Sequence, residues 1–378
     1  MAEKYDFVMD PCGDVVLILK HPDSPFAVWD EDSATIADDP SPADDHLPVP
    51  DTDRTFLLSS RHLCLASPVL KVMLSGGWIE GIKSAPDGLY QLTAEHWDSE
   101  ALAVVMNVVH GRWNLVPREI SVEMLAKLAV IVDYYDIHEP LQLILHMWMT
   151  PFSASSIPTR IGRELVLWLL IAWVFKNDVL FLQAAKVAIL RSTDEIRIPM
   201  DVPIPSSVIK GINTRRDESI KDIAGGLKEL VHGYIVGQYG CDFECSSIEL
   251  GALMKGLHKV QWAYERPSNA PQFGNLSLAE VVTKLRTIRC PVWTKVPDSC
   301  CCSSGRRYSY GNSQTCQKAH ECLEEIGVFE VQDFRLRVGE DVTTCTSGGL
   351  VQHIARLVES LESRIVITLE QFGFGVGS

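Results

Sequence analysis

The stretch FLLSSRHLCLASPVLKVML, residues 56–74, constrains the fold most, because its hydrophobic period changes within a few residues. Residues 54–59 have the apolar pattern of a β-strand, and from Ser60 onward the apolar residues fall near helical spacing. Pro68 lies inside that run, and proline is tolerated in the first turn of a helix. We therefore predict a strand followed by two short helices, the second capped by Ser67 with Pro68 at its first position.

The sequence on either side continues this alternation of strands and helices. Further strands are predicted over 14–19 (DVVLIL) and 89–92, and the run 26–29 is predicted to continue a hairpin. Further helices are predicted over 98–110, 121–135 and 141–149. Strand 54–59 is expected to be the return partner of strand 14–19. The N-terminal part is thus predicted to be a small α+β domain, with helices packed against a short sheet.

Residues 30–53, between the first two strands, differ sharply in composition from their surroundings. They contain nine Asp or Glu, four Pro and no Lys or Arg. Such a segment cannot bury enough apolar surface to offset the entropy of ordering it. We predict an acidic disordered insertion that acts as a solvated loop, with a docking motif for a basic partner as the alternative.

The second half of the chain is predicted to be mainly helical. Its predicted helices are 164–175, 178–190, 208–231, 248–262, 277–288 and 350–365, and Ser277 with Glu280 forms a capping box. Pro199, Pro203 and Pro205 mark a connector. We predict three regions: a domain over 1–152, a helical domain over 153–290, and a Cys-rich loop with a C-terminal helix over 291–378.

The order of four motifs in the N-terminal domain resembles a known family. In this order, DVVLIL, FLLSSRHLCLASPVLKVML, LYQLTAEHWDSEALAVVMNVVHG and LAKLAVIVDYYDIHEPL resemble the BTB/POZ fold in its filamentous-fungal form, over about residues 12–150. Within them, FLLSS is similar to a strand of that family, and LASPVLKVML and LAVIVDYYDI are similar to two of its helices. The segments CDFEC, LGALMKGLHK, CPVW and HECL resemble the C-terminal region of such fungal proteins. The resemblance implies a BTB/POZ-like domain followed by a mainly α-helical C-terminal domain. It also implies a protein-interaction module that self-associates or serves as an adaptor.

The same resemblance gives one candidate partner-binding site. BTB proteins that recruit a cullin scaffold often carry an apolar residue, any residue and then Glu just after the helix that LASPVLKVML resembles. Trp78 and Glu80 of GGWIEG stand at those positions. An aromatic side chain on a glycine-flanked loop can insert into a partner pocket, and the carboxylate can pair with a basic rim. A substrate adaptor of a cullin-type ubiquitin ligase is therefore an alternative function, and an incidental turn is the other interpretation.

Several classes of function are disfavoured by what the sequence lacks. The formal net charge of −15 argues against nucleic acid or an anionic membrane as the main partner. The most apolar run, 165–175, is shorter than the ~18 residues of a membrane span, so we predict a buried helix. No phosphate-binding loop, nucleophile elbow or HExxH motif is present. We expect no enzymatic activity, no cofactor and no catalytic residues, and a cytoplasmic or nuclear location, since no signal peptide is apparent.

The cysteines leave one alternative open. Cys241, Cys245, Cys290, Cys316, His320 and Cys322 have residue types that bind zinc. No CxxC pair occurs, and Cys300, Cys301 and Cys302 are adjacent, which is poor geometry for a tetrahedral site. We expect free thiols and no metal site, with a structural-zinc regulatory protein as the alternative. His96, His110 and His138 are predicted to lie in helical regions and to be packed or surface residues, and Trp168 and Trp173 to be core residues.

Overall fold

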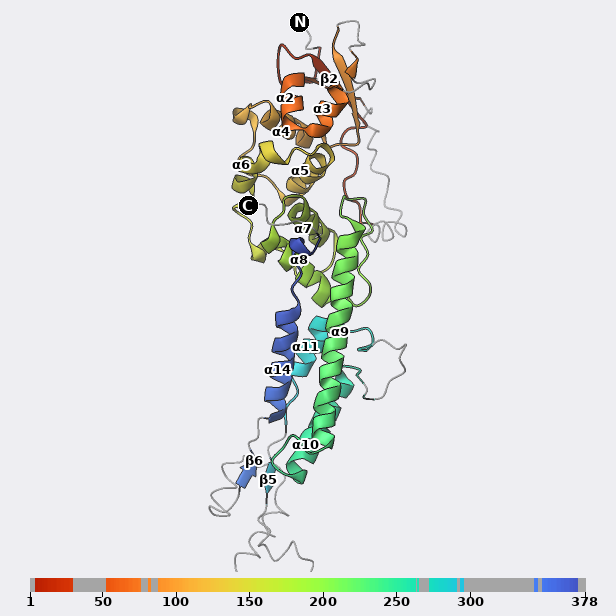
Figure 1. The fold of residues 1–378 in the computed structure, drawn as a ribbon, viewed down its shortest axis with the longest axis vertical. Helices are drawn as coiled ribbons and strands as arrows, with labels where there is room; N and C mark the ends of the chain where they lie inside the picture. Colours follow the sequence, from red (N-terminus) through yellow and green to blue (C-terminus); the bar gives the residue numbers. More distant parts are fainter. Residues whose placement is uncertain are drawn as a thin grey trace, which may run out of the picture. The chain divides into compact units, whose positions relative to one another are not determined.

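The computed structural model describes residues 4–29, 52–75, 81–82, 88–262, 264, 272–290, 293–295, 343–345 and 349–372 (Figure 1). The fold is α+β, as predicted, with a small mixed sheet and a majority of helices. The chain forms two compact units. The first unit comprises Met1–Asp217 and Ile365–Ser378, and the second comprises Glu218–Arg364.

The first unit contains a four-stranded sheet. Its strands are β1 (Phe7–Val8), β2 (Val15–Lys20), β3 (Arg54–Leu58) and β4 (Tyr90–Glu95), in the order β1-β3-β2-β4. The central strand β2 runs antiparallel to β3 and parallel to β4, with Val15 opposite both Leu58 and Tyr90. Alternate residues of β2 are buried, which places Val15, Leu17 and Leu19 in the core. The predicted pairing of the first two long strands is confirmed.

The change of period after β3 produces two short helices, as predicted. They are α2 (Ser60–Ala66) and α3 (Pro68–Ser75). Ser67 separates them, and its Oγ accepts a hydrogen bond from the backbone N–H of Leu70 at 2.9 Å. The same hydroxyl donates to the carbonyl of Tyr135. Ser67 therefore caps α3 and also attaches it to a helix that lies far along the chain.

Five further helices complete most of the first unit. They are α4 (Ser99–Val109), α5 (Val122–Tyr135), α6 (His138–Met149), α7 (Arg163–Val174) and α8 (Asp178–Arg191), with short 3₁₀ turns η2 (Trp113–Leu115) and η3 (Ala154–Ser156). Ser121 caps α5 by accepting from the N–H of Met124. Leu70 and Leu128, predicted to be buried, are 1% and 0% exposed. All residues from Leu165 to Val174 of α7 are buried, which accounts for its unbroken apolar run. Among the described residues, no helix is both long enough and apolar enough to cross a membrane.

The last described segment of the chain also belongs to the first unit. Residues 365–372 end in the 3₁₀ turn η4 (Leu369–Phe372). The ring of Phe372 lies edge-on to Trp173 and Phe181, with centroid distances of 6.2 and 6.1 Å. Gly211 packs against this ring so closely that a Cβ there would lie 2.6 Å from it. A segment from the far end of the chain thus completes the aromatic core of this unit.

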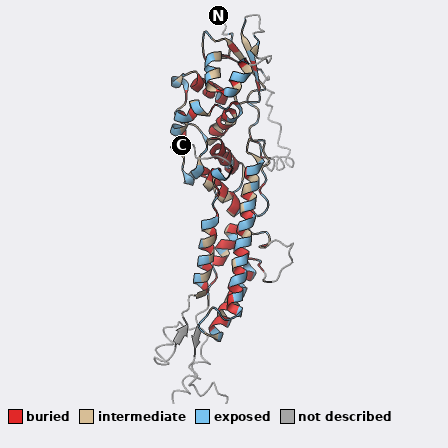
Figure 2. Cartoon of the chain, in the orientation of Figure 1, coloured by how far each residue is buried: buried red, intermediate tan, exposed pale blue. Residues whose placement is uncertain are grey.

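The second unit is built mainly from helices. α9 (Ser206–Ile235) begins in the first unit and continues into the second, which also contains α10 (Phe243–Lys259), α11 (Leu278–Arg286), α14 (Gly349–Arg364) and the strands β5 (Trp293–Lys295) and β6 (Thr343–Cys345). Buried residues lie on one side of these helices (Figure 2), among them Leu227, Leu253, Leu285 and Ile354. The predicted capping box of Ser277 and Glu280 is present at the start of α11.

Two predictions about local structure are wrong. Residues 26–29 form no strand, and the chain after β2 turns away through the left-handed φ angles of His21 (47°), Asp23 (59°) and Ala27 (49°). His96 lies in a bend after β4, also with positive φ (64°), and not in a helix. The predicted domain boundaries at 152 and 290 stay predictions.

Candidate functional site

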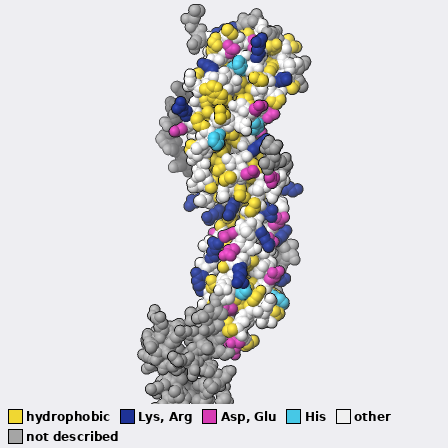
Figure 3. Space-filling view, turned by 60° about the vertical axis from the view of Figure 1, so that its left-hand side comes forward, with side chains coloured by type: hydrophobic (Ala, Val, Ile, Leu, Met, Phe, Trp, Pro, Cys, Tyr) yellow, Lys and Arg dark blue, Asp and Glu magenta, His cyan; other side chains and the backbone are white. Residues whose placement is uncertain are grey.

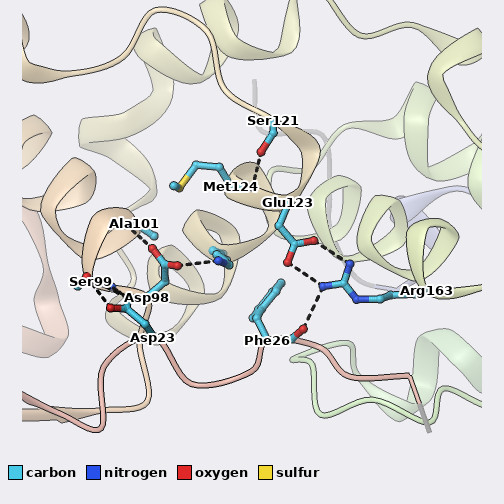
Figure 4. Close-up of polar contacts among 10 residues, drawn as sticks. Asp23, Phe26, Asp98, Ser99, Ala101, Ser121, Glu123, Met124 and Arg163 are labelled. Carbon is cyan, nitrogen blue, oxygen red and sulfur yellow. Dashed lines mark hydrogen bonds and ion pairs between the residues drawn. The ribbon is translucent and has the colours of Figure 1, made fainter. Parts of the chain in front are cut away.

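The best-defined polar cluster of the first unit begins at the N-terminus of α4. Asp98 caps this helix, since its Oδ1 accepts from the N–H of Ala101 at 2.8 Å. Its Oδ2 lies 2.6 Å from Nζ of Lys127 on α5, and the two side chains are only 17% and 22% exposed (Figure 4). The positive end of the α4 dipole and the ammonium group both attract the Asp98 side chain. This ion pair attaches the start of α4 to the middle of α5.

A second ion pair joins α5 to α7. Nη1 and Nη2 of Arg163 each donate to one carboxylate oxygen of Glu123, both at 2.7 Å. The same guanidinium donates to the backbone carbonyl of Ala27 at 2.8 Å. It also donates to the carbonyl of Phe26 at 3.0 Å (Figure 4). A planar guanidinium with several fixed donors can satisfy a carboxylate and two carbonyls at once. Arg163 therefore fixes the backbone of residues 26–27 against two helices.

The other end of that segment is held by Asp23. Its Oδ1 accepts from the backbone N–H of Ser99 at 2.8 Å and from the Ser99 hydroxyl at 2.9 Å. The segment 23–27 is thus attached to α4 at one end and to α5 and α7 at the other. We call these residues, Asp23, Asp98, Lys127, Glu123 and Arg163, the polar clamp. The clamp fixes the position from which the chain enters the acidic insertion.

A cleft of about 1060 Å³ lies beside the polar clamp. It is lined by residues 24–28, 95–98 and 198–203, together with Lys127, Val130 and Ile131 of α5. Its size is in the range of ligand sites. Asp98 and Lys127 already neutralise each other in its wall. The cleft can accommodate a segment of peptide or a small molecule, but its ion pair has a positioning role and supplies no unpaired charge.

The cleft also contains a serine next to a histidine. Ser24 Oγ lies 3.2 Å from Nδ1 of His96, which is a distance suited to a nucleophile and its base. However, the Ser24 hydroxyl donates to the carbonyl of His21 at 2.8 Å, so the His96 Nδ1–H must donate to Ser24 Oγ. The His96 ring stacks on His21 at 5.3 Å between centroids. In this arrangement His96 does not accept the serine proton, and the pair lacks the geometry of an activated nucleophile.

His110 is a packed histidine with a defined protonation state. The backbone N–H of Ser59 donates to its Nε2 at 3.0 Å, so that nitrogen must be unprotonated. Its Nδ1 lies 2.8 Å from the carbonyl of Met106 and donates to it. Burial is the largest cause that lowers the pKa of the His110 imidazole, and the ring of His62 lies 5.0 Å away. Neutral His110 therefore links the end of α4 to the end of β3.

The stability of this link is expected to depend on pH. Because the pKa of His110 is lower in the folded chain than its ordinary value of 6.5, its contribution is complete above that pH and is lost as the pH falls. We expect the unfolding free energy of the wild type, relative to His110→Gln, to decrease as the pH falls from about 7.5 to about 5.5. Urea unfolding at a series of pH values measures this difference. A difference that does not change with pH, or that grows as the pH falls, contradicts the assigned tautomer.

The remaining predicted site residues are only partly within the described structure. Cys241 is exposed, Cys245 is buried and Cys290 is half-buried. No group of three or more His, Cys, Asp or Glu with metal-binding geometry occurs in the described ranges. Cys316, His320 and Cys322, like Trp78 and Glu80, lie outside the described residues. The zinc and cullin hypotheses therefore stay predictions. His138 lies at the start of α6, with its Nδ1 3.1 Å from the Asp136 carboxylate, and is a surface residue.

The chain was compared with protein-family models, with curated proteins and with solved structures, and none of the three comparisons gave a match. The function therefore has to be argued from the chain's own residues.

Proposed function

We propose that the protein is a non-enzymatic protein-interaction module of the BTB/POZ type that associates with a second copy of itself. Support for the family comes from the type of element that each motif forms: most of DVVLIL lies in β2, FLLSS covers the end of β3, LASPVLKVML contains most of α3 and most of LAVIVDYYDI lies in α5. The two strands DVVLIL and FLLSS are neighbours in the sheet, and LASPVLKVML forms α3 after a short α2.

One observation carries the proposal of self-association. Large apolar side chains are exposed on α6 and on the neighbouring 3₁₀ turn η2: Leu143 (80% exposed), Met147 (38%), Trp113 (49%) and Leu115 (55%). Nε1 of Trp148 donates to the carbonyl of Pro117 at 2.8 Å, which holds α6 next to the segment that follows η2. We call these four exposed residues the α6–η2 patch. Hydrophobic side chains are frequent on the surface of the first unit in Figure 3.

The composition of the α6–η2 patch favours a second copy as its partner. In a symmetric dimer each patch meets its own counterpart, so charged residues at the centre would oppose like charges. None of the four patch residues is charged, and Leu143 and Met147 are one helical turn apart on α6. Large exposed apolar side chains are typical of interface centres. A stable interface buries about 800 Å² on each partner, so these residues supply its centre and polar neighbours supply the rim.

Sedimentation velocity over a series of concentrations tests this proposal. We expect the wild type to dimerise and Leu143→Glu/Met147→Glu to dissociate at least about tenfold more readily, because a carboxylate would be buried against its own copy. Gln142→Glu is the matched control, since it adds a charge at an exposed neighbouring position of α6. A wild type that stays monomeric at every concentration, or a double variant that dimerises as well as the control, contradicts the proposal.

A further inference from the structure

A second exposed surface, on α2 and α3, combines apolar and cationic residues. Arg61, Leu65, Pro68, Lys71 and Val72 are all exposed, Leu65 by 88% and Val72 by 58%. Arg61 and Leu65 are one helical turn apart on α2, Pro68 and Lys71 are one turn apart on α3, and the two helices contact each other. We call these five residues the α2–α3 face. Neither helix contains Asp or Glu.

The positive charge of this face is not neutralised by nearby described residues. Asp14 is the carboxylate at the start of α2, and it accepts from the backbone N–H and the hydroxyl of Ser60, both at 2.8 Å. Within the described parts of the chain, no salt bridge joins Arg61 or Lys71 to a carboxylate. This surface has positive charge on a chain whose formal net charge is −15. Its chemistry fits a partner segment that is acidic and carries a few apolar side chains.

The chain itself contains a segment with that composition. Residues 30–51 contain eight Asp or Glu and no Lys or Arg, and their apolar residues include Ile36, Leu47 and Val49. We propose that residues 30–51 dock on the α2–α3 face of the same chain and occupy it in competition with acidic segments of other proteins. The contact combines attraction between opposite charges with burial of Leu65 and Val72.

The connection along the chain permits this contact. Residue 51 lies three positions before β3, and β3 leads into α2 at Ser60. A five-residue strand spans about 17 Å, whereas a segment of about 22 residues can extend over ~70 Å. The polar clamp fixes the other end of the segment at residues 23–27. Two fixed ends hold the segment near the face at an effective concentration that can reach the millimolar range, so even weak docking would occupy the face.

The test uses a fluorescent synthetic peptide with the sequence of residues 30–51. It is titrated into the full chain and into a variant in which a Gly/Ser linker of equal length replaces residues 30–51, with fluorescence anisotropy as the readout. We expect the linker variant to bind the peptide, and the full chain to bind it at least about tenfold more weakly, because its own segment competes. Binding to the linker variant should weaken as the salt concentration rises.

Charge-reversal variants locate the contact. In the linker variant, Arg61→Glu/Lys71→Glu should abolish peptide binding. Arg191→Glu/Lys210→Glu should not, although it changes the net charge equally at two exposed positions of the first unit. Circular dichroism verifies that both variants are folded.

Three outcomes would overturn the inference. The peptide could bind the full chain and the linker variant equally, it could bind neither, or Arg61→Glu/Lys71→Glu could leave binding unchanged. Competition in the full chain that grows with protein concentration would also overturn it, because docking would then occur between copies. None of these outcomes bears on dimerisation through the α6–η2 patch, which involves different residues and is measured without the peptide.

Discussion

Replacing Leu128 with Ala is expected to lower the free energy of unfolding by about 2 to 5 kcal/mol. Leu128 is 0% exposed and lies on α5, which packs against both α4 and α7. Removing its side-chain atoms forfeits their transfer free energy and leaves a cavity, which rigid neighbouring helices fill only in part. Leu70→Ala on α3 should have an effect in the same range, since Leu70 is 1% exposed.

Urea unfolding followed by circular dichroism measures these changes. Val179→Ala is the control, because it also removes apolar side-chain atoms, at a position of α8 that is 63% exposed. Its cost should stay within about 0.5 kcal/mol. A cost for Leu128→Ala below about 0.5 kcal/mol would mean that the buried faces of α3 and α5 are assigned incorrectly.

Trp148→Ala is expected to be at least as destabilising, with a cost of about 3 to 5 kcal/mol. The Trp148 side chain is 1% exposed, and its indole N–H donates to the carbonyl of Pro117 at 2.8 Å. The substitution removes the ring that packs α6 onto the unit, and it also leaves that carbonyl without its donor. The effect therefore combines a large cavity with a lost hydrogen bond.

Trp148→Phe separates the two contributions. Phenylalanine keeps most of the apolar surface but cannot donate, so we expect a cost of about 1 to 3 kcal/mol. Thermal or urea unfolding of both variants provides the comparison. Equal costs for Trp148→Ala and Trp148→Phe would assign the whole effect to the hydrogen bond. Negligible costs for both would contradict the buried position of α6.

The elements that could be predicted from the sequence are those specified by local chemistry. The change of hydrophobic period after residue 59 and the helix cap at Ser67 can both be recognised in the amino-acid sequence. The helices α2 and α3 form as expected. Ser121 and Ser277 likewise mark helix starts through hydrogen bonds to residues only three positions away. These signals need no knowledge of the rest of the fold.

The features that could not be predicted depend on residues far apart in the sequence. The two-residue strand β1 runs parallel to β3. Beside it, the backbone N–H and the hydroxyl of Thr55 both donate hydrogen bonds to the Asp6 carboxylate. Residues 26–29 have the residue types of a strand. However, Arg163 donates to the carbonyls of Phe26 and Ala27, which precede it in the sequence by 137 and 136 residues. Those carbonyls are therefore not available for a hairpin.

The polar clamp was missed for the same reason. In the sequence, Glu123 and Arg163 are charged residues of the kind common at protein surfaces, and each lies near the start of a helix. Only the packing of α5 against α7 brings them together. The site residues that were predicted from the family resemblance, Trp78 and Glu80, lie outside the described residues, so the clamp and the two exposed surfaces were found from the structure alone.

The contribution of Phe372 to the first unit has a consequence for synthesis on the ribosome. The aromatic residues it contacts, Trp173 and Phe181, are translated before the whole of the second unit, whereas Phe372 is translated after it. The nascent chain must therefore expose an apolar site on α7 and α8 while roughly 190 further residues are added, and this takes many seconds at ordinary rates of translation. During that interval the exposed site is a target for chaperones.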